Sequence, residues 1–381
     1  MSRIIYFSSD YSPHDYRFLA ALSGTEHEVY YLRLGNTGRP TEGRPLPSRI
    51  HPIPWAGGQT PFTWRGLPRL TQSLRQVVRK IKPDLIHAGP IQTCAFLAVL
   101  SGFRPVLTMS WGFDLMQDAD RNSWWRWVTR YTLRHTTLFT SDAEITREKA
   151  IAHGMDPNRT VVFAWGVELD AYRMAGADDG GQAAAVQPVP PDAPAAGFIL
   201  FCNRSWEPRY GVDVLAQAFV KAAKQCRNIS LLLLGDGSQA SMIRRILEGG
   251  GVADRVKYIG RVPRSDLPRY YQMADLYVSA SHIDGSSVSL MEAMACGLPC
   301  LVSDIPANRE WVNEGVNGWL FPDGSVDQLA AAILRVHGQR NDLASIKQAA
   351  RRTAEQKADW RTNFQTLLRA YDQAISLHSS A

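Results

Sequence analysis

The chain has 381 residues, of which 45% are hydrophobic and 20% are charged. This length exceeds what one hydrophobic core usually serves, and it predicts two domains. No apolar run reaches the roughly 18 residues of a membrane-spanning helix, which argues against an integral membrane protein. The net charge of +6 suits an anionic ligand or a membrane surface, and it is too small to indicate a nucleic-acid partner.

The N-terminal segment predicts no secretory signal, because its short apolar run meets Ser8, Ser9 and Asp10 at once. We therefore expect a cytoplasmic protein. Its five cysteines lack the paired spacing of a zinc site, and we expect them to be reduced and to serve as small hydrophobic residues.

Short apolar runs alternate with amphipathic segments through the first half. A helix is predicted at 15–22, and strands are predicted at 4–8, 28–34, 85–87, 106–109 and 137–139. Strands that alternate with helices indicate parallel βαβ units.

The stretch 175–197 is almost entirely Ala, Gly, Pro, Asp and Gln, a composition typical of a linker. The alternation then resumes, with helices predicted at 212–223, 242–248 and 287–296, and strands at 198–202, 230–234, 256–259, 274–279 and 300–303. The predicted fold is α/β, with two Rossmann-like, doubly wound domains that face each other across a cleft. The expected division is an N-terminal Rossmann-like domain (1–173), a linker (174–197), a C-terminal Rossmann-like domain (198–355) and a C-terminal helix (356–381) that packs back on the first domain.

Residues 274–321 are the most informative segment. A predicted strand leads into a loop of small residues and then into a helix that carries Glu292 and stops at Gly297. Backbone N–H groups in such a loop can approach phosphate oxygens, and the helix N-terminus adds about half a positive charge. Two local alternatives remain, a capping box from Ser289 to Glu292 and a plain turn at Asp284.

This segment resembles the signature of the family-4 glycosyltransferases of the GT-B fold. The pattern is an acidic residue, seven residues, a glutamate, and then Ala-Met-Ala-Cys-Gly-Leu-Pro, here at 293–299. The family usually has glutamate at the first position, where this chain has Asp284. The resemblance implies that Glu292 binds the donor ribose, that Asp284 faces the transferred sugar, and that the loop residues Gly285, Ser286, Ser287 and Val288 bind the donor.

Three further segments carry the resemblance. Arg204 matches the arginine that the family directs at the diphosphate, whereas the lysine position holds Tyr210, with Arg209 beside it. For Arg209 a plain surface charge is the alternative. The resemblance also implies donor contacts at two turns that follow predicted strands, through Gly235, Gly260 and Arg261.

The first domain offers candidates for the acceptor side. His14 and Asp15 follow the first strand, and the alternative is a helix start capped by Asp15. His87 follows another strand and could equally be a structural histidine. Trp111 stands where the family often has a histidine, and Asp114 is a candidate for the acceptor hydroxyl or a helix cap.

Two basic stretches, 64–82 and 121–135, contain no acidic residue, and the second also carries three tryptophans. Basic amphipathic helices with tryptophan bind anionic bilayers, so peripheral membrane contact is one interpretation. The alternative is two ordinary helices with a solvated face. Asp118 and Asp120 resemble a metal motif but fit better as acids at the start of a helix.

The resemblance implies a retaining enzyme that uses a nucleotide-sugar donor, without metal or cofactor, in surface polysaccharide or glycoconjugate biosynthesis. It also implies that the domain at 1–173 binds the acceptor and the domain at 198–355 binds the nucleotide sugar. The acceptor is then a glycan, a lipid-linked intermediate or another hydroxyl compound. Two alternatives stay open, a nucleotide-sugar epimerase of the same fold and a non-catalytic GT-B-like scaffold.

Overall fold

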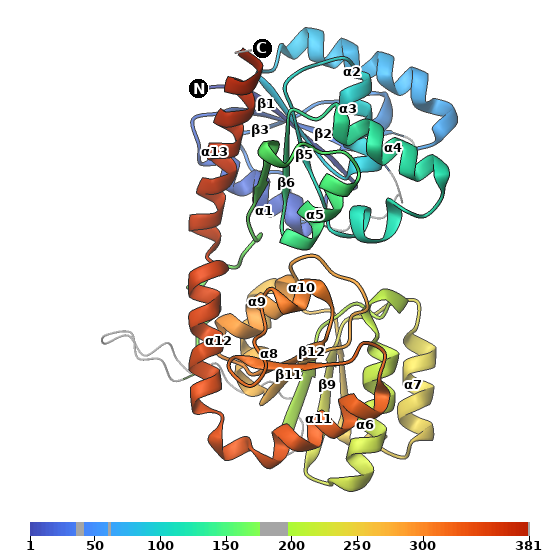
Figure 1. Ribbon diagram of the computed structural model, residues 1–381, viewed down its shortest axis with the longest axis vertical. Helices are drawn as coiled ribbons and strands as arrows, with labels where there is room; N and C mark the ends of the chain where they lie inside the picture. Colours follow the sequence, from blue (N-terminus) through green and yellow to red (C-terminus); the bar gives the residue numbers. More distant parts are fainter. Residues whose placement is uncertain (36–41, 60–61, 176–196, 380–381) are drawn as a thin grey trace. The chain divides into compact units, whose positions relative to one another are not determined.

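The computed structural model describes residues 1–35, 42–59, 62–175 and 197–379 (Figure 1). Most of the predicted linker, at 176–196, lies outside these described residues. The chain forms two compact units, one from Met1–Phe163 with Phe364–Ala381 and the other from Ala164–Asn363. Residues 164–173, which the sequence analysis placed in the first domain, therefore belong to the second unit.

The first unit is built on a seven-stranded parallel sheet in the order β3-β2-β1-β4-β5-β6-β7. The strands are β1 (Arg3–Ser9), β2 (Glu28–Leu34), β3 (Ile50–Pro52), β4 (Leu85–Ala88), β5 (Val106–Met109), β6 (Leu138–Ser141) and β7 (Thr160–Val162). The helices are α1 (Pro13–Ser23), α2 (Leu67–Ile81), α3 (Phe96–Leu100), α4 (Ser123–Arg134), α5 (Glu144–Ala152) and α13 (Trp360–Ser379), whose residues from Phe364 onward belong here. The sequence analysis missed β3 and β7, because three-residue strands show no periodicity.

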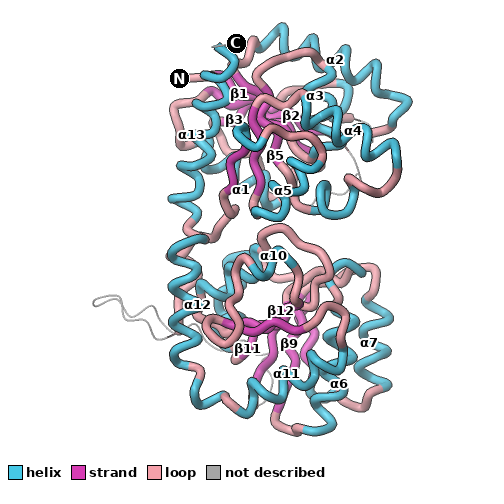
Figure 2. The backbone as a smooth tube through the Cα atoms, viewed as in Figure 1, coloured by secondary structure: helices cyan, strands magenta, loops and turns pink. Residues whose placement is uncertain are grey.

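Helices cover both faces of this sheet (Figure 2). On one face Ile5 and Phe7 pack against α2 and α3, and the buried stripe of α2 is Leu70, Leu74, Val77 and Ile81. On the other face Tyr6 stacks on Phe18 of α1, with ring centroids 6.4 Å apart. Cover on both faces explains why the strands are continuous apolar runs.

The second unit repeats this plan on a six-stranded parallel sheet in the order β10-β9-β8-β11-β12-β13. Its strands are β8 (Phe198–Cys202), β9 (Ile229–Leu234), β10 (Val256–Gly260), β11 (Leu276–Ser279), β12 (Cys300–Ser303) and β13 (Gly318–Phe321). Its helices are α6 (Val212–Gln225), α7 (Ala240–Gly249), α8 (Leu267–Met273), α9 (Val288–Ala295), α10 (Pro306–Arg309), α11 (Val326–Gly338) and α12 (Ala344–Lys357). Side chains of α6, α7 and α11 pack on one face, and those of α8, α9 and α12 on the other. The predicted fold class is confirmed.

Both the backbone conformation and the lack of space for a side chain require glycine at position 211, just before α6. Its φ is +59°, and a Cβ there would lie 2.0 Å from the carbonyl oxygen of Ala280, just after β11. We expect Gly211→Ala to destabilise the protein by about 3 kcal/mol or more, because the clash adds to the roughly 1 kcal/mol left-handed strain. Gly251→Ala is the matched control in chemical denaturation, since its φ is +71° with nothing within 4 Å of the added atom. Equal losses in the two variants would contradict the steric argument.

Candidate functional site

The strand order of the second unit reverses between β8 and β11, which are neighbours. In open α/β sheets, ligands bind beyond the carboxyl ends of the strands at this point of reversal. Asn203 and Arg204 directly follow β8, and the loop 280–287 follows β11. Sheet order therefore brings together two segments that the sequence analysis had linked only by resemblance.

A buried ion pair joins these two segments. Arg204 Nη2 donates to Asp284 Oδ2 at 2.6 Å, with the two side chains only 10% and 16% exposed. Arg204 Nη1 also donates to the hydroxyls of Ser287 and Ser289, at 2.8 and 3.0 Å. The guanidinium lies 4.2 Å from the ring centroid of Tyr210, the residue at the family's lysine position. Burial raises the pKa of the Asp284 carboxyl, and the charge of Arg204 opposes that rise.

Glu292 is buried, and two phenols hold its carboxylate. Tyr172 donates to Oε1 at 2.7 Å and Tyr271 donates to Oε2 at 2.8 Å. Burial raises the pKa of both tyrosines, and the charge of Glu292 adds to the rise, so both remain hydrogen-bond donors. Arg264 Nη2 lies 3.9 Å from Oε1.

The capping-box interpretation of Ser289 and Glu292 is wrong. The N-cap of α9 is Ser287, whose hydroxyl accepts a hydrogen bond from the backbone N–H of Leu290. The helix thus begins at Val288, one residue before Ser289, and this register turns Glu292 toward Tyr172 and Tyr271. Of the loop, Gly285, Ser286 and Ser287 are buried and Val288 is half-buried.

The two predicted glycine turns meet each other. The backbone N–H of Gly235 donates to the carbonyl of Gly260 at 2.8 Å. Both glycines have positive φ, and a Cβ on Gly235 would lie 2.9 Å from the backbone oxygen of Arg204. Arg261 is exposed, and Arg209 is half-buried with its guanidinium 5.6 Å from the Tyr210 ring centroid. Donor contacts by Arg209, Gly260 and Arg261 stay predictions.

Two buried polar atoms after β8 have no partner among the described residues. They are Nε of Arg204 and Oδ1 of Asn203, one donor and one acceptor on consecutive residues. Buried groups of this kind are rare in folded proteins, because each loses its hydration without a compensating bond. Both side chains belong to the network that links the segments after β8 and β11.

Asp15 in the first unit does not cap α1 as its N-cap residue. Ser12 is the N-cap, and Asp15 is the third helical residue of a capping box, accepting from the backbone N–H of Ser12 at 2.6 Å. Its carboxylate also accepts from the hydroxyls of Ser12 and Tyr6, at 2.7 and 3.1 Å. Asp15 therefore takes part in capping α1, as predicted, but from the third helical position and not as the N-cap residue.

Asp114 is fully buried and ties two loops together. It accepts from the Ser110 hydroxyl at 2.7 Å and from the backbone N–H groups of Ile91, Trp111 and Leu115, at 3.0–3.1 Å. Burial raises its pKa to about 6, although these bonds lower it. This is a structural role, and contact with an acceptor stays a prediction.

The half-buried His14 and Trp111 have ring centroids 6.2 Å apart, so the structure brings these two acceptor candidates together.

His87 is a buried structural histidine. Its Nδ1 lies 2.7 Å from the hydroxyl of Tyr371 on α13, 284 residues away, and burial lowers its pKa to about 3. The folded-state pKa lies below the ordinary value of 6.5. The contribution of neutral His87 to the free energy of unfolding is therefore fully present above pH 6.5.

We expect this support to be lost as the pH falls from 6.5 toward 3, at about 1.4 kcal/mol per pH unit. Thermal unfolding across this range, for the wild type and His87→Gln, measures the effect. The wild type should lose more stability than the variant, and parallel curves would contradict the assignment.

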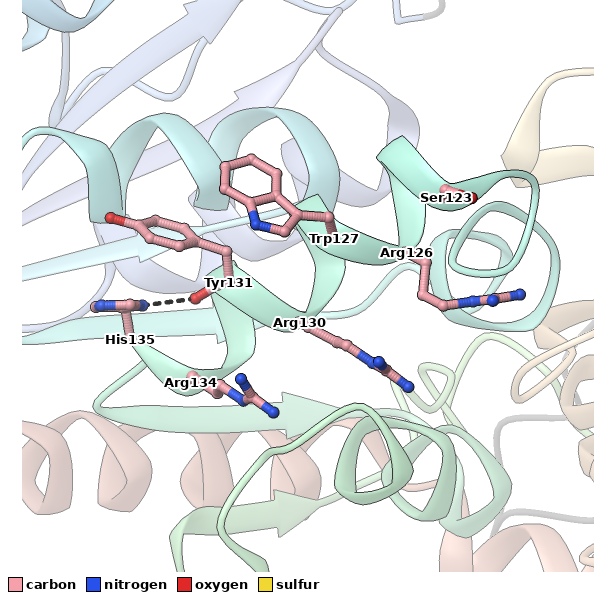
Figure 3. A pocket seen from close by; sticks show the side chains of 7 residues that line it. All are labelled: Ser123, Arg126, Trp127, Arg130, Tyr131, Arg134 and His135. Carbon is pink, nitrogen blue, oxygen red and sulfur yellow. Dashed lines mark hydrogen bonds between the residues drawn. The ribbon is translucent and has the colours of Figure 1, made fainter.

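The outer face of α4 is basic and aromatic (Figure 3). Trp124, Trp127, Tyr131 and His135 form a row in which each ring stacks on the next, with centroids 5.0, 5.4 and 4.2 Å apart. A pocket of about 340 Å³ beside this row is lined by Ser123, Arg126, Trp127, Arg130, Tyr131, Arg134 and His135. All of its lining residues belong to the first unit.

Asp120 is engaged by basic side chains. It lies 2.5 Å from Nζ of Lys149 and 3.3 Å from Nε of Arg126. In the part of the chain that the structure describes, no group of three or more His, Cys, Asp or Glu residues is placed to hold a metal ion. In the same part, no helix is long and apolar enough to cross a membrane.

The sequence analysis missed four residues that surround Glu292 or its partners. Tyr172, Asn203, Arg264 and Tyr271 all lie in this network, and Asn203 Nδ2 donates to the Tyr271 hydroxyl at 2.7 Å. Tyr172 and Tyr271 belong to no recognisable motif, so no local signal marks either as a site residue. Asn203 is next to Arg204, and Arg264 lies three residues after Arg261, so both could have been found from those candidates.

Comparison with known proteins identifies the family. Residues 14–166 match the family model described as "Glycosyl transferase 4-like domain", and residues 191–353 match "Glycosyl transferases group 1". One curated relative is the amylovoran biosynthesis glycosyltransferase AmsK of Erwinia amylovora, 31% identical over 38% of this chain and 37% of that protein. Another is the phosphatidyl-myo-inositol mannosyltransferase of Mycobacterium leprae, 30% identical over 46% of each. The matches thus span less than half of these relatives.

Solved structures agree on the fold. Sucrose-phosphate synthase from Thermosynechococcus elongatus superposes with a TM-score of 0.82, at 17% identity and full coverage of both chains. Anabaena HepE in complex with UDP-glucose gives 0.73, at 19% identity, over 98% of this chain and all of that one. At such identities the likeness shows the fold alone, whereas the two family models together account for most of the sequence. The chain therefore belongs to the family-4 glycosyltransferases of the GT-B fold.

Proposed function

We propose that the protein transfers a sugar from a nucleotide-sugar donor to a hydroxyl acceptor in surface polysaccharide or glycoconjugate biosynthesis. The observation that carries this is the network after β8 and β11, in which Arg204 pairs with Asp284 beside the start of α9 and two phenols hold the carboxylate of Glu292. Glu292 binds the donor ribose, and Asp284 faces the transferred sugar. Arg204 and the N–H groups at the start of α9 bind the diphosphate.

The donor is held without a metal ion in this proposal. Arg204 and the N-terminus of α9 supply positive potential where the leaving diphosphate gains charge. The reaction retains the anomeric configuration, and the leaving phosphate oxygen accepts the proton of the acceptor hydroxyl. No strong protein base is then required, which agrees with Asp114 and His87 being committed to structural bonds.

The acceptor is a glycan or a lipid-linked intermediate, bound by the first unit near His14 and Trp111. The names of two relatives support this class. One is named an amylovoran biosynthesis glycosyltransferase and the other a phosphatidyl-myo-inositol mannosyltransferase.

We also propose that α2 and α4 contact the inner face of the membrane. The stretches 64–82 and 121–135 hold ten Lys and Arg residues and no acid, so the rest of the chain has a net charge of −4. All ten are exposed, and so are Trp124 and Trp127, at 45% and 47%. Trp64, ahead of α2, packs on Trp124 with ring centroids 5.4 Å apart, which makes the two helices one surface. Basic residues add about 1 kcal/mol each at an anionic bilayer, and tryptophan favours its interface.

Vesicle sedimentation tests the membrane proposal. The wild type should bind phosphatidylglycerol-rich vesicles at low salt and release at high salt, and Arg130→Glu/Arg134→Glu should lose this binding. Lys224→Glu/Lys257→Glu is the control, because it changes the net charge by the same amount at exposed residues of the second unit. This variant should still bind the vesicles. Equal binding by both double variants would overturn the proposal.

Thermal-shift measurements in EDTA with UDP-, GDP-, ADP- and dTDP-sugars test the donor assignment, because a ligand of the folded state raises its stability. We expect a shift with one base, and transfer when an acceptor extract is added. Donor turnover without acceptor would favour the epimerase, and no shift with any donor would favour the scaffold.

A further inference from the structure

The carboxylate of Glu292 lies between two phenols from separate segments of the second unit. Tyr172 comes from the segment that follows β7, and Tyr271 comes from α8. Each donates to a different carboxylate oxygen, so the plane of the carboxylate is fixed and not only its position. A carboxylate accepts about four hydrogen bonds, so phenols and ligand hydroxyls can share it.

Asn203 fixes the direction in which Tyr271 donates. Its Nδ2 donates to the Tyr271 oxygen at 2.7 Å, which leaves the phenol proton for Glu292 at 2.8 Å or the carbonyl of Ser289 at 3.2 Å. The shorter bond to a charged acceptor is the stronger one. The side chains of Asn203, Tyr271 and Glu292 therefore form a directed chain that begins at the carboxyl end of β8.

The backbone of Tyr172 is equally well held. Arg351 of α12 donates from Nη1 to the carbonyls of Tyr172 and Ala295, both at 2.6 Å. A Cβ on Gly297, where φ is +64°, would lie 2.8 Å from the side chain of Met174. Packing this close ties the segment around Tyr172 to the end of α9, the helix that carries Glu292.

We propose that Tyr172 and Tyr271 are positioning residues that aim the Glu292 carboxylate at the two ribose hydroxyls of the donor, with Asn203 directing Tyr271. This rests on the proposed function, since it assumes a nucleotide donor. It explains why two buried phenols occupy both oxygens of one acid. Without them the carboxylate would rotate, and the geometry for a cis-diol would be lost.

Calorimetric titration of the full chain with UDP and GDP, each beside its 2′,3′-dideoxy form, tests this proposal. Tyr172→Phe and Tyr271→Phe should each weaken binding of the ribonucleotide about tenfold. Both should leave binding of the dideoxy form within about twofold of the wild type, because the ligand then lacks the hydroxyls that Glu292 meets.

Tyr277→Phe is the matched control, because this fully buried phenol bonds to the Ser289 hydroxyl at 2.7 Å and not to Glu292. It should not discriminate between the two nucleotide forms. The proposal is overturned if the Tyr172 and Tyr271 variants weaken both forms equally, or neither. If the wild type binds neither nucleotide, the proposed function itself is overturned. That outcome differs from failure of the positioning proposal, in which the wild type still binds.

Discussion

Glu292→Gln should weaken donor binding about 100-fold and lower the free energy of unfolding by about 2 kcal/mol. Both oxygens of Glu292 accept from phenol O–H groups, and a glutamine offers one acceptor and one NH2 donor. In either orientation the NH2 group faces a tyrosine hydroxyl, so at least one phenol can no longer donate to this side chain, and the remaining bond is to a neutral acceptor. Hydrogen bonds to a charged group contribute about 1.5–3 kcal/mol each, and two ribose hydroxyls would lose this strength together.

Calorimetry with the donor found by thermal shift, together with chemical denaturation, measures both effects. Glu355→Gln is the control, since this glutamate is 48% exposed and pairs with Arg351 on the surface of α12. It should change neither quantity measurably. Wild-type donor affinity in Glu292→Gln would remove Glu292 from the donor site.

Arg204→Met should lower the melting temperature by about 10 °C and abolish detectable donor binding. The pair with Asp284 is buried, and removing one partner of a buried pair costs about 3–5 kcal/mol because the other charge stays without compensation. The pKa of Asp284, already raised by burial, should rise further without Arg204. A raised folded-state pKa favours the fold at low pH, so the variant should regain stability as the pH falls toward 4.

Circular dichroism melts at pH 7.5 and pH 5 measure this, and the double variant Arg204→Met/Asp284→Asn should recover part of the loss at pH 7.5. Arg335→Met is the control, because its pair with Glu314 is about half exposed on both sides and is worth at most about 1 kcal/mol. Additive effects of the two substitutions in the double variant would contradict the coupling of Arg204 with Asp284.

Two departures from the family pattern, at 210 and 284, fall on residues that contact the same side chain. Asp284 replaces the usual glutamate and Tyr210 replaces the usual lysine, and both meet the guanidinium of Arg204. The shorter acid forms an ion pair, and the aromatic ring covers the guanidinium face. These substitutions thus form one local arrangement around Arg204.

The sequence by itself determined the fold class, most strands and the acidic segment at 284–292. Continuous apolar runs that end at glycine or polar residues predict the buried strands from neighbouring residues alone. The family signature lies within sixteen residues of chain, 284–299. The strands at 28–34, 106–109, 198–202 and 300–303 have the predicted bounds. These features depend on neighbours in the chain, which a sequence displays directly.

The tertiary structure alone decided which side chains meet at the site. Tyr172 reaches Glu292 across 120 residues, and Arg204 reaches Asp284 across 80. Those meetings depend on β8 lying beside β11 and on the register of α9, which begins after Ser287. Sheet order is set by burial over the whole unit, and no local pattern around Tyr172 or Arg204 encodes a partner that distant.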